Sequence, residues 1–154
     1  MSDHPAIAAA PGWLAARPAD KRLRVLIADD TPAIREILTR MLRQSVDAQL
    51  FEARNGHEVV REYRARQPHL IFLDIDMPEL DGLAALEEIR GLDPQAYVVM
   101  VSGHSSLEKV QQAVALGAAG FVVKPFSNRR IAEALQKFEQ TTGQAGRVHA
   151  GGPG

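Results

Sequence analysis

The chain has 154 residues with 18 basic and 19 acidic side chains and no cysteine. This near-neutral charge gives no overall field that would favour nucleic acid or a membrane surface, and the lack of cysteine excludes disulfides and thiol chemistry. No apolar stretch approaches the roughly 20 residues that span a bilayer, and the Ala- and Pro-rich start lacks the features of a secretory signal. We therefore expect a cytoplasmic protein that binds neither nucleic acid nor membrane directly.

The composition changes near both ends of the chain. Residues 1–20 are interrupted by prolines, and residues 141–154 contain five glycines. Such segments have little apolar surface to bury and are typical of disordered tails. We expect one folded domain over residues 21–140, with a disordered tail at 1–20 and a Gly-rich flexible tail at 141–154.

The first predicted strand, Leu23–Ala28, is a nearly continuous apolar run that ends in Asp29 and Asp30. A helix should follow, with Thr31 as its N-cap and Pro32 at its first position. Its predicted buried stripe consists of Ile34, Ile37, Leu38, Met41 and Leu42. The acid pair therefore lies between a strand and a helix.

The middle of the chain repeats this pattern. A second strand is predicted at Ala48–Ala53, and a helix over Glu58–Arg66 is entered through Asn55-Gly56. The apolar run His69–Asp74 then predicts a buried strand that ends in a carboxylate. A third helix follows at Leu83–Arg90.

The last two strands also end in polar side chains. Ala96–Val101 is followed by Ser102, and Gly120–Lys124 ends in a lysine before Pro125. The helix between them is predicted at Ser105–Leu116, with Gly117 as its C-terminal cap. Ile131, Leu135 and Phe138 mark the fifth helix.

Five strand–helix units in alternation predict an α/β fold with a doubly wound parallel sheet. The carboxyl ends of parallel strands meet at one edge of such a sheet, where ligands bind. Each polar residue alone has an ordinary explanation as a turn former, helix cap or solvated strand end. Together they predict one cleft that contains Asp29, Asp30, Asp74, Ser102 and Lys124.

This set of side chains suits phosphoryl transfer. A carboxylate that attacks a phosphoryl group is repelled by the negative charge of that group, and a divalent ion with a lysine can neutralise the charge. Clustered carboxylates are good ligands for Mg²⁺. No general base is needed, and we expect His57 and His69 to be structural or solvated.

The motifs resemble the receiver domain of two-component response regulators over residues Arg22–Phe138. The resemblance rests on Asp29-Asp30, on the run Leu73–Gly82, on Ser102-Gly103, and on Phe121–Phe126. It implies a flavodoxin-like (βα)₅ fold with strand order 2-1-3-4-5, of the chemotaxis-type, single-domain kind.

The resemblance also implies the role of each acid. Asp74 corresponds to the phosphoacceptor, and Asp30 and Asp74 correspond to direct Mg²⁺ ligands. The backbone carbonyl of Asp76 would complete the protein ligands, and Asp29 would act through water.

On the other side of the cleft, Ser102 resembles the hydroxyl that contacts the phosphoryl group, and Lys124 the ammonium that pairs with it. Phe121 occupies the switch-aromatic position, and the Lys124–Pro125 bond would be cis. Asp76 and His104 occupy positions that tune reaction rates in the family.

The implied partner is a sensor histidine kinase or a histidine phosphotransfer protein. The protein would not be an enzyme beyond its own phosphorylation and dephosphorylation. It would switch the face made by Ser105–Leu116, Gly120–Val123 and the helix from Asn128, for partner binding or onward phosphotransfer. We expect a monomer or weak dimer.

Parts of the sequence also fit three other kinds of protein. A haloacid-dehalogenase-type phosphohydrolase would share Asp74 and Asp76, but its metal-binding acids follow the lysine, whereas Asp29 and Asp30 precede it. A calcium loop fails because Glu79 stands where glycine is required. A phosphorylation-independent binding module on the same fold is the remaining alternative.

Overall fold

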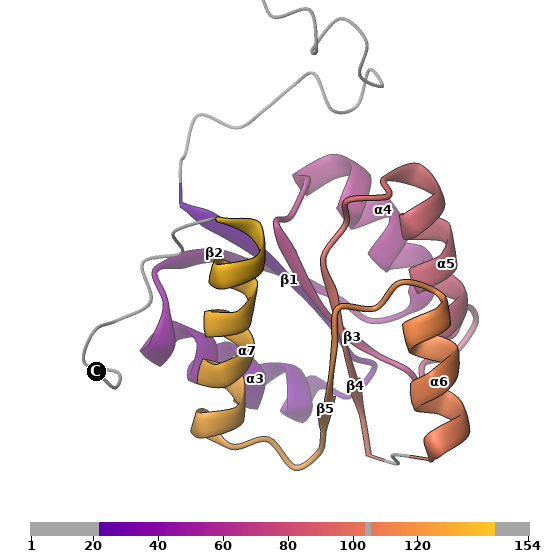
Figure 1. The fold of residues 1–154 in the computed structure, drawn as a ribbon. Coiled ribbons are helices and arrows are strands. Elements are labelled where there is room, and N and C mark those ends of the chain that lie inside the picture. Colours follow the sequence, from indigo (N-terminus) through magenta and orange to yellow (C-terminus); the bar gives the residue numbers. More distant parts are fainter. Residues whose placement is uncertain (1–21, 104–105, 144–154) are drawn as a thin grey trace, which may run out of the picture.

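The computed structural model describes residues 22–103 and 106–143. Strands and helices alternate five times, as predicted (Figure 1). The elements are β1 (Leu23–Ala28), α3 (Pro32–Ser45), β2 (Ala48–Ala53), α4 (Gly56–Arg66), β3 (Leu70–Asp74), α5 (Gly82–Leu92), β4 (Val98–Ser102), α6 (Leu107–Ala115), β5 (Gly120–Val123) and α7 (Asn128–Thr142).

The five strands form one parallel sheet in the order β2-β1-β3-β4-β5, which confirms the predicted flavodoxin-like topology. The central strands end at nearly the same level of the sheet. Ala28 lies opposite Leu73, and Asp74 lies opposite Val101. The residues that follow each strand therefore meet at the same edge.

Helices cover both faces of the sheet. Figure 1 shows α3 and α7 on one face and α4, α5 and α6 on the other. Inward-facing strand residues pack against each helix layer, and among them Phe72 and Met100 are fully buried. Burial of a side chain of this size contributes about 1.5–3 kcal/mol, so the central strands are rigid supports for the residues at their ends.

Several element boundaries differ from those predicted. Helix α6 begins at Leu107, two residues after its predicted start, and the Oγ of its N-cap residue Ser106 accepts from the Lys109 N–H at 3.2 Å. Thr31 is the N-cap residue of α3, as predicted, although its side chain makes no capping hydrogen bond. Asp29 instead accepts the Thr31 N–H at 2.9 Å. The last helix, α7, extends to Thr142.

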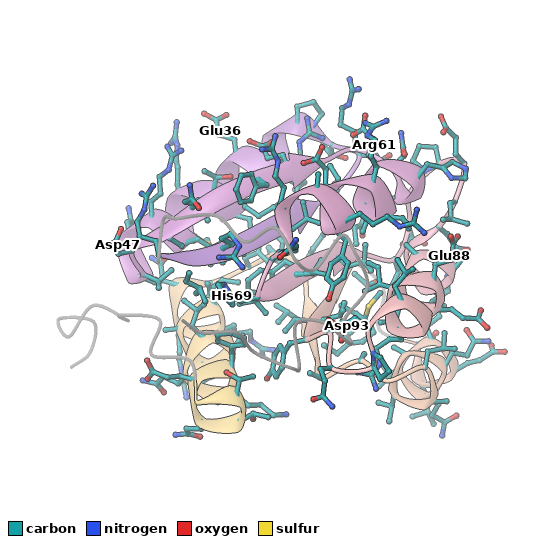
Figure 2. All side chains as sticks on the ribbon, turned by 90° about the horizontal axis from the view of Figure 1, so that it is seen from above. Glu36, Asp47, Arg61, His69, Glu88 and Asp93 are labelled. Carbon is teal, nitrogen blue, oxygen red and sulfur yellow. The ribbon has the colours of Figure 1, made fainter. Side chains whose placement is uncertain are left out.

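The amino edge of the sheet contains a cavity of about 570 Å³, at the opposite end from the acidic strand tips. Figure 2 looks onto this edge and labels His69 and Asp93, which both line the cavity. His69 Nδ1 accepts the Arg24 N–H at 3.0 Å, and the buried Arg24 guanidinium donates to the Gln67 carbonyl. These contacts close the end of α4 and support the structural role expected for His69.

Within residues 22–103 and 106–143, no helix is long and apolar enough to cross a membrane.

Candidate functional site

Three carboxylates gather at the carboxyl edge of the sheet. Asp29, Asp30 and Asp74 each offer one oxygen, and these oxygens lie within 4.8 Å of one another. Asp29 and Asp74 are buried, with 3% and 2% of their surface exposed, whereas Asp30 is exposed. Arg35, which the sequence analysis did not identify, holds the Asp29 main chain by donating to its carbonyl at 2.6 Å.

Lys124 reaches this cluster from the end of β5. Its Nζ lies 2.7 Å from Asp29 Oδ2 and 3.4 Å from Asp74 Oδ1, and its side chain is 21% exposed. The Lys124–Pro125 peptide bond is cis, as the resemblance implied. The structure therefore brings together four of the predicted site residues.

The charges of these groups are strongly coupled. Burial, together with the negative charge of Asp29, raises the pKa of Asp74 from an ordinary 3.8 to about 6, although Lys124 opposes this change. Burial alone would lower the pKa of Lys124, but its hydrogen bond to Asp29 and the charge of Asp74 outweigh that effect and raise it. Asp74 is thus a carboxylate whose charge is poorly compensated without a cation.

Ser102 lies on β4, the strand next to that of Asp74, and Phe121 lies on β5, one strand further along the sheet. Ser102 ends β4, is fully buried, and its carbonyl accepts the Lys124 N–H at 2.8 Å. Phe121 lies opposite Met100 in the sheet and is half-buried against the core on the side of α4, α5 and α6. These positions suit the roles that the resemblance implies.

Asp76 lies at the exposed rim. Its side chain is 55% exposed, and its Oδ1 lies 3.6 Å from Lys109 Nζ on α6. The main chain of Asp76 donates a hydrogen bond that lowers the pKa of Asp74. The sequence analysis missed Lys109, because no spacing rule links it to Asp76. His104, the other expected rim residue, lies outside the described residues.

The loop between β3 and α5 is held by close backbone contacts at two glycines. A Cβ on Gly82 would stand 2.0 Å from the Asp74 carbonyl oxygen, and a Cβ on Gly56 would stand 2.1 Å from the Leu80 carbonyl oxygen. Glu79, in the same loop, has a left-handed backbone with φ of 68°. Two glycines therefore permit close backbone contacts that hold the segment carrying Asp74 and Asp76.

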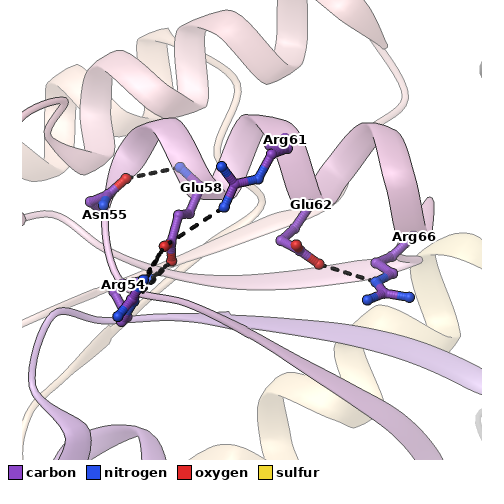
Figure 3. A network of polar contacts seen from close by, with 6 residues as sticks. All are labelled: Arg54, Asn55, Glu58, Arg61, Glu62 and Arg66. Carbon is purple, nitrogen blue, oxygen red and sulfur yellow. Dashed lines mark hydrogen bonds and ion pairs between the residues drawn. The ribbon is translucent and has the colours of Figure 1, made fainter.

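The start of α4, which supports this loop, is fixed by a polar network (Figure 3). Asn55 caps the helix by accepting the Glu58 N–H at 2.9 Å, and Glu58 accepts from the Arg54 main chain at 2.8 Å and side chain at 2.7 Å. The Arg54 hydrogen bonds lower the pKa of Glu58 to about 2. Gly56 is therefore held between a capped helix start and the loop.

The site fits a hard divalent cation. Such an ion prefers carboxylate and carbonyl oxygens, and Mg²⁺ typically binds through one or two carboxylates and keeps several waters. The three clustered oxygens and the raised pKa of Asp74 both indicate a site at which a bound cation would be stabilised. Lys124 lies on one side of this cluster, where it can meet an anionic ligand of the metal.

Comparison with known sequences gives one clear family. A family model described as the response regulator receiver domain matches residues 25–136. The chemotaxis protein CheY of Listeria monocytogenes is 41% identical over 115 residues, which cover 75% of this chain and 97% of that protein. CheY of Bacillus subtilis is 39% identical over 114 residues, covering 74% and 95%.

Solved structures agree with this result. Chemotaxis protein CheY4 of Vibrio cholerae aligns with a TM-score of 0.71 and 26% identity, over 76% of this chain and 98% of that chain. The receiver domain of NarL from Mycobacterium tuberculosis aligns with a TM-score of 0.73 and 30% identity, over 79% and 98%. The strand order, the clustered acids and these matches together show that the chain belongs to the response regulator receiver domain family.

Proposed function

We propose that this receiver domain accepts a phosphoryl group on Asp74. The observation that carries the proposal is the position of Lys124 Nζ, 2.7 Å from Asp29 and 3.4 Å from Asp74, beside three clustered carboxylates. An Asp74 oxygen would attack phosphorus in line and form a new O–P bond. The P–N bond of a phosphohistidine would break, and the imidazole would leave with the electron pair and take up a proton. The product is an acyl phosphate.

Mg²⁺ is the proposed cofactor. Asp30 and Asp74 would bind it directly with the backbone carbonyl of Asp76, and Asp29 would act through water. When bound, the ion would neutralise charge on the phosphoryl oxygens. Lys124 would pair with the phosphoryl group from the other side, and the Ser102 hydroxyl would contact it.

The phosphoryl donor would be a sensor histidine kinase or a histidine phosphotransfer protein. The relatives named as chemotaxis proteins span nearly the same length as the matched region, which supports a similar signalling role. The chain would catalyse only its own phosphorylation and dephosphorylation. Its output would be a change in the face formed by α6, β5 and α7, for partner binding or onward phosphotransfer.

The competing functions are less well supported. A haloacid-dehalogenase-type phosphohydrolase has its acidic metal ligands after the lysine in the chain. Here the clustered acids Asp29 and Asp30 come before Lys124. A phosphorylation-independent binding module would not need the close approach of Lys124 to Asp74. We therefore retain the phosphoacceptor role.

Incubation with acetyl phosphate and Mg²⁺ tests this function. Intact-mass measurement should show one added phosphoryl group on the wild type and on the surface control Asp47→Asn. Asp74→Asn should take up none. Equal uptake by Asp74→Asn and wild type would contradict the assignment, and uptake without any need for Mg²⁺ would contradict the metal site.

A further inference from the structure

Helix α6 is attached to the rest of the domain by little buried surface. Ala113 is its one buried residue, whereas each of the other helices in the described part of the chain buries at least two. Leu107 and Val114 on α6 are 70% and 64% exposed. Because little apolar burial holds α6, a single polar contact can bias its position.

Such a contact is made by Lys109, in the first turn of α6. Ser106 caps this turn by accepting the Lys109 N–H, and the Lys109 ammonium lies 3.6 Å from Asp76 Oδ1. The positive end of the helix dipole disfavours a cation at this position. A lysine at this position is therefore not stabilised by its own helix, but it is stabilised by the ion pair with Asp76.

We propose that Lys109 is a positioning residue that neutralises Asp76 at the mouth of the cleft and ties the first turn of α6 to the loop after Asp74. Asp76 adds a carboxylate two residues after Asp74, and its main chain donates a hydrogen bond to the Asp74 side chain. Unpaired, it would attract Mg²⁺ but repel an anionic phosphoryl donor. Paired with Lys109, it presents almost no net charge to either.

Loss of the Lys109 charge should therefore have opposite effects on Mg²⁺ binding and on phosphorylation. Lys109→Gln should tighten Mg²⁺ binding about two- to fivefold at low salt, the range expected for a half-exposed ion pair. The same change should slow phosphorylation by acetyl phosphate at saturating Mg²⁺ by a similar factor. A purely structural defect would weaken both. Both effects should shrink as salt shortens the Debye length.

Calorimetric Mg²⁺ titration and phosphorylation rates on four variants test the proposal. Arg66→Gln is the matched control, because it removes the same charge from an exposed pair with Glu62. Asp76→Asn/Lys109→Gln should return both quantities to within about twofold of the wild type, because the uncompensated carboxylate is gone. Asp76→Asn alone should weaken Mg²⁺ binding about two- to fivefold at low salt, because it leaves the Lys109 charge uncompensated.

Two results would overturn the proposal: Mg²⁺ affinity in Lys109→Gln equal to that of Arg66→Gln, or a double variant that keeps the full shift of Lys109→Gln. The rate measurement rests on the proposed function of Asp74. If the wild type took up no phosphoryl group, that function would fail, and the Mg²⁺ titration would still decide the role of Lys109. Faster exchange of the amides of residues 109 and 110, which donate to Ser106, should accompany the shift in Lys109→Gln compared with Arg66→Gln.

Discussion

Lys124 is closer to Asp29, at 2.7 Å, than to Asp74, at 3.4 Å. The lysine thus supplies positive charge to an acid that the proposed metal would also neutralise. It follows that Lys124 and a divalent ion act on the same negative cluster. Their charges repel each other, and an anionic ligand bound between them would offset this repulsion.

Lys124→Met should therefore tighten Mg²⁺ binding by roughly tenfold, because one unit of repulsion close to a divalent ion is removed. Titration calorimetry at about pH 8 measures this effect. Lys137→Met is the control, since Lys137 on α7 donates to the carbonyl of Ala119, just before β5, and not to the acids. Weaker Mg²⁺ binding in Lys124→Met would show that Lys124 orders the acids more than it repels the ion.

The raised pKa of Asp74 makes stability depend on pH. The folded protein holds the Asp74 proton up to about pH 6, whereas the unfolded chain releases it near 3.8. Without metal, stability is therefore lost as pH rises between these values. The ionised carboxylate should destabilise the fold by about 3 kcal/mol at pH 7.5 and about 1 kcal/mol at pH 4.5.

Urea unfolding in the presence of a chelator tests this dependence. Asp74→Asn should be more stable than the wild type at pH 7.5 and should lose most of that advantage at pH 4.5. Asp47→Asn, at an exposed position, provides the baseline. The same difference at both pH values would mean that Asp74 titrates normally.

Glu79 has a left-handed backbone that costs a residue with a side chain about 1 kcal/mol. Asparagine adopts this conformation more readily, so Glu79→Asn should stabilise the protein by about 0.5–1 kcal/mol. Thermal unfolding measures this gain. Glu87→Asn, the same change on the exposed part of α5, should instead lose a few tenths of a kcal/mol through helix propensity. A loss in both variants would mean that Glu79 makes a compensating contact.

Gly82 permits α5 to begin directly behind Asp74. In Gly82→Ala, the new methyl group would meet the main chain of Asp74 and Ile75, which cannot move as a flexible side chain would. We expect a loss of at least about 2 kcal/mol and weaker Mg²⁺ binding. Gly91→Ala is a matched control on the same helix, because nothing lies within 4 Å of its Cβ. It should be neutral or gain up to about 1 kcal/mol.

Phe121 should change its environment when the site is occupied by beryllofluoride. Movement of the Ser102 hydroxyl toward the phosphoryl position would leave space for the Phe121 ring, and the ring buries no hydroxyl that needs a partner. The ligand would bias two existing states. NMR should show shifts at Phe121 and along α6. Ser102→Ala should bind beryllofluoride with those shifts reduced. Shifts confined to the surroundings of Asp74 would contradict the switch.

The central architecture was predictable because its signals are local. The predicted bounds of β1 and β2 match the structure, and the polar residues at the carboxyl ends of β1, β3, β4 and β5 indicated the edge where the site forms. The start of α6 was not predictable, since Ser105 and Ser106 are equally good caps in sequence. The contact between Lys109 and Asp76 was missed because it joins two flexible side chains across a gap that no periodicity describes.

The contact from Asp29 to Lys124 joins residues that are 95 positions apart in the chain. The proposed metal site draws on the ends of β1 and β3, and its cationic neighbour follows β5, the last strand. No hairpin or single strand–helix unit contains enough of these groups to bind the ion. Added Mg²⁺ should therefore raise the free energy of complete unfolding while leaving partly folded forms unaffected. Recovery of metal affinity during refolding would then report the moment at which the whole sheet is assembled.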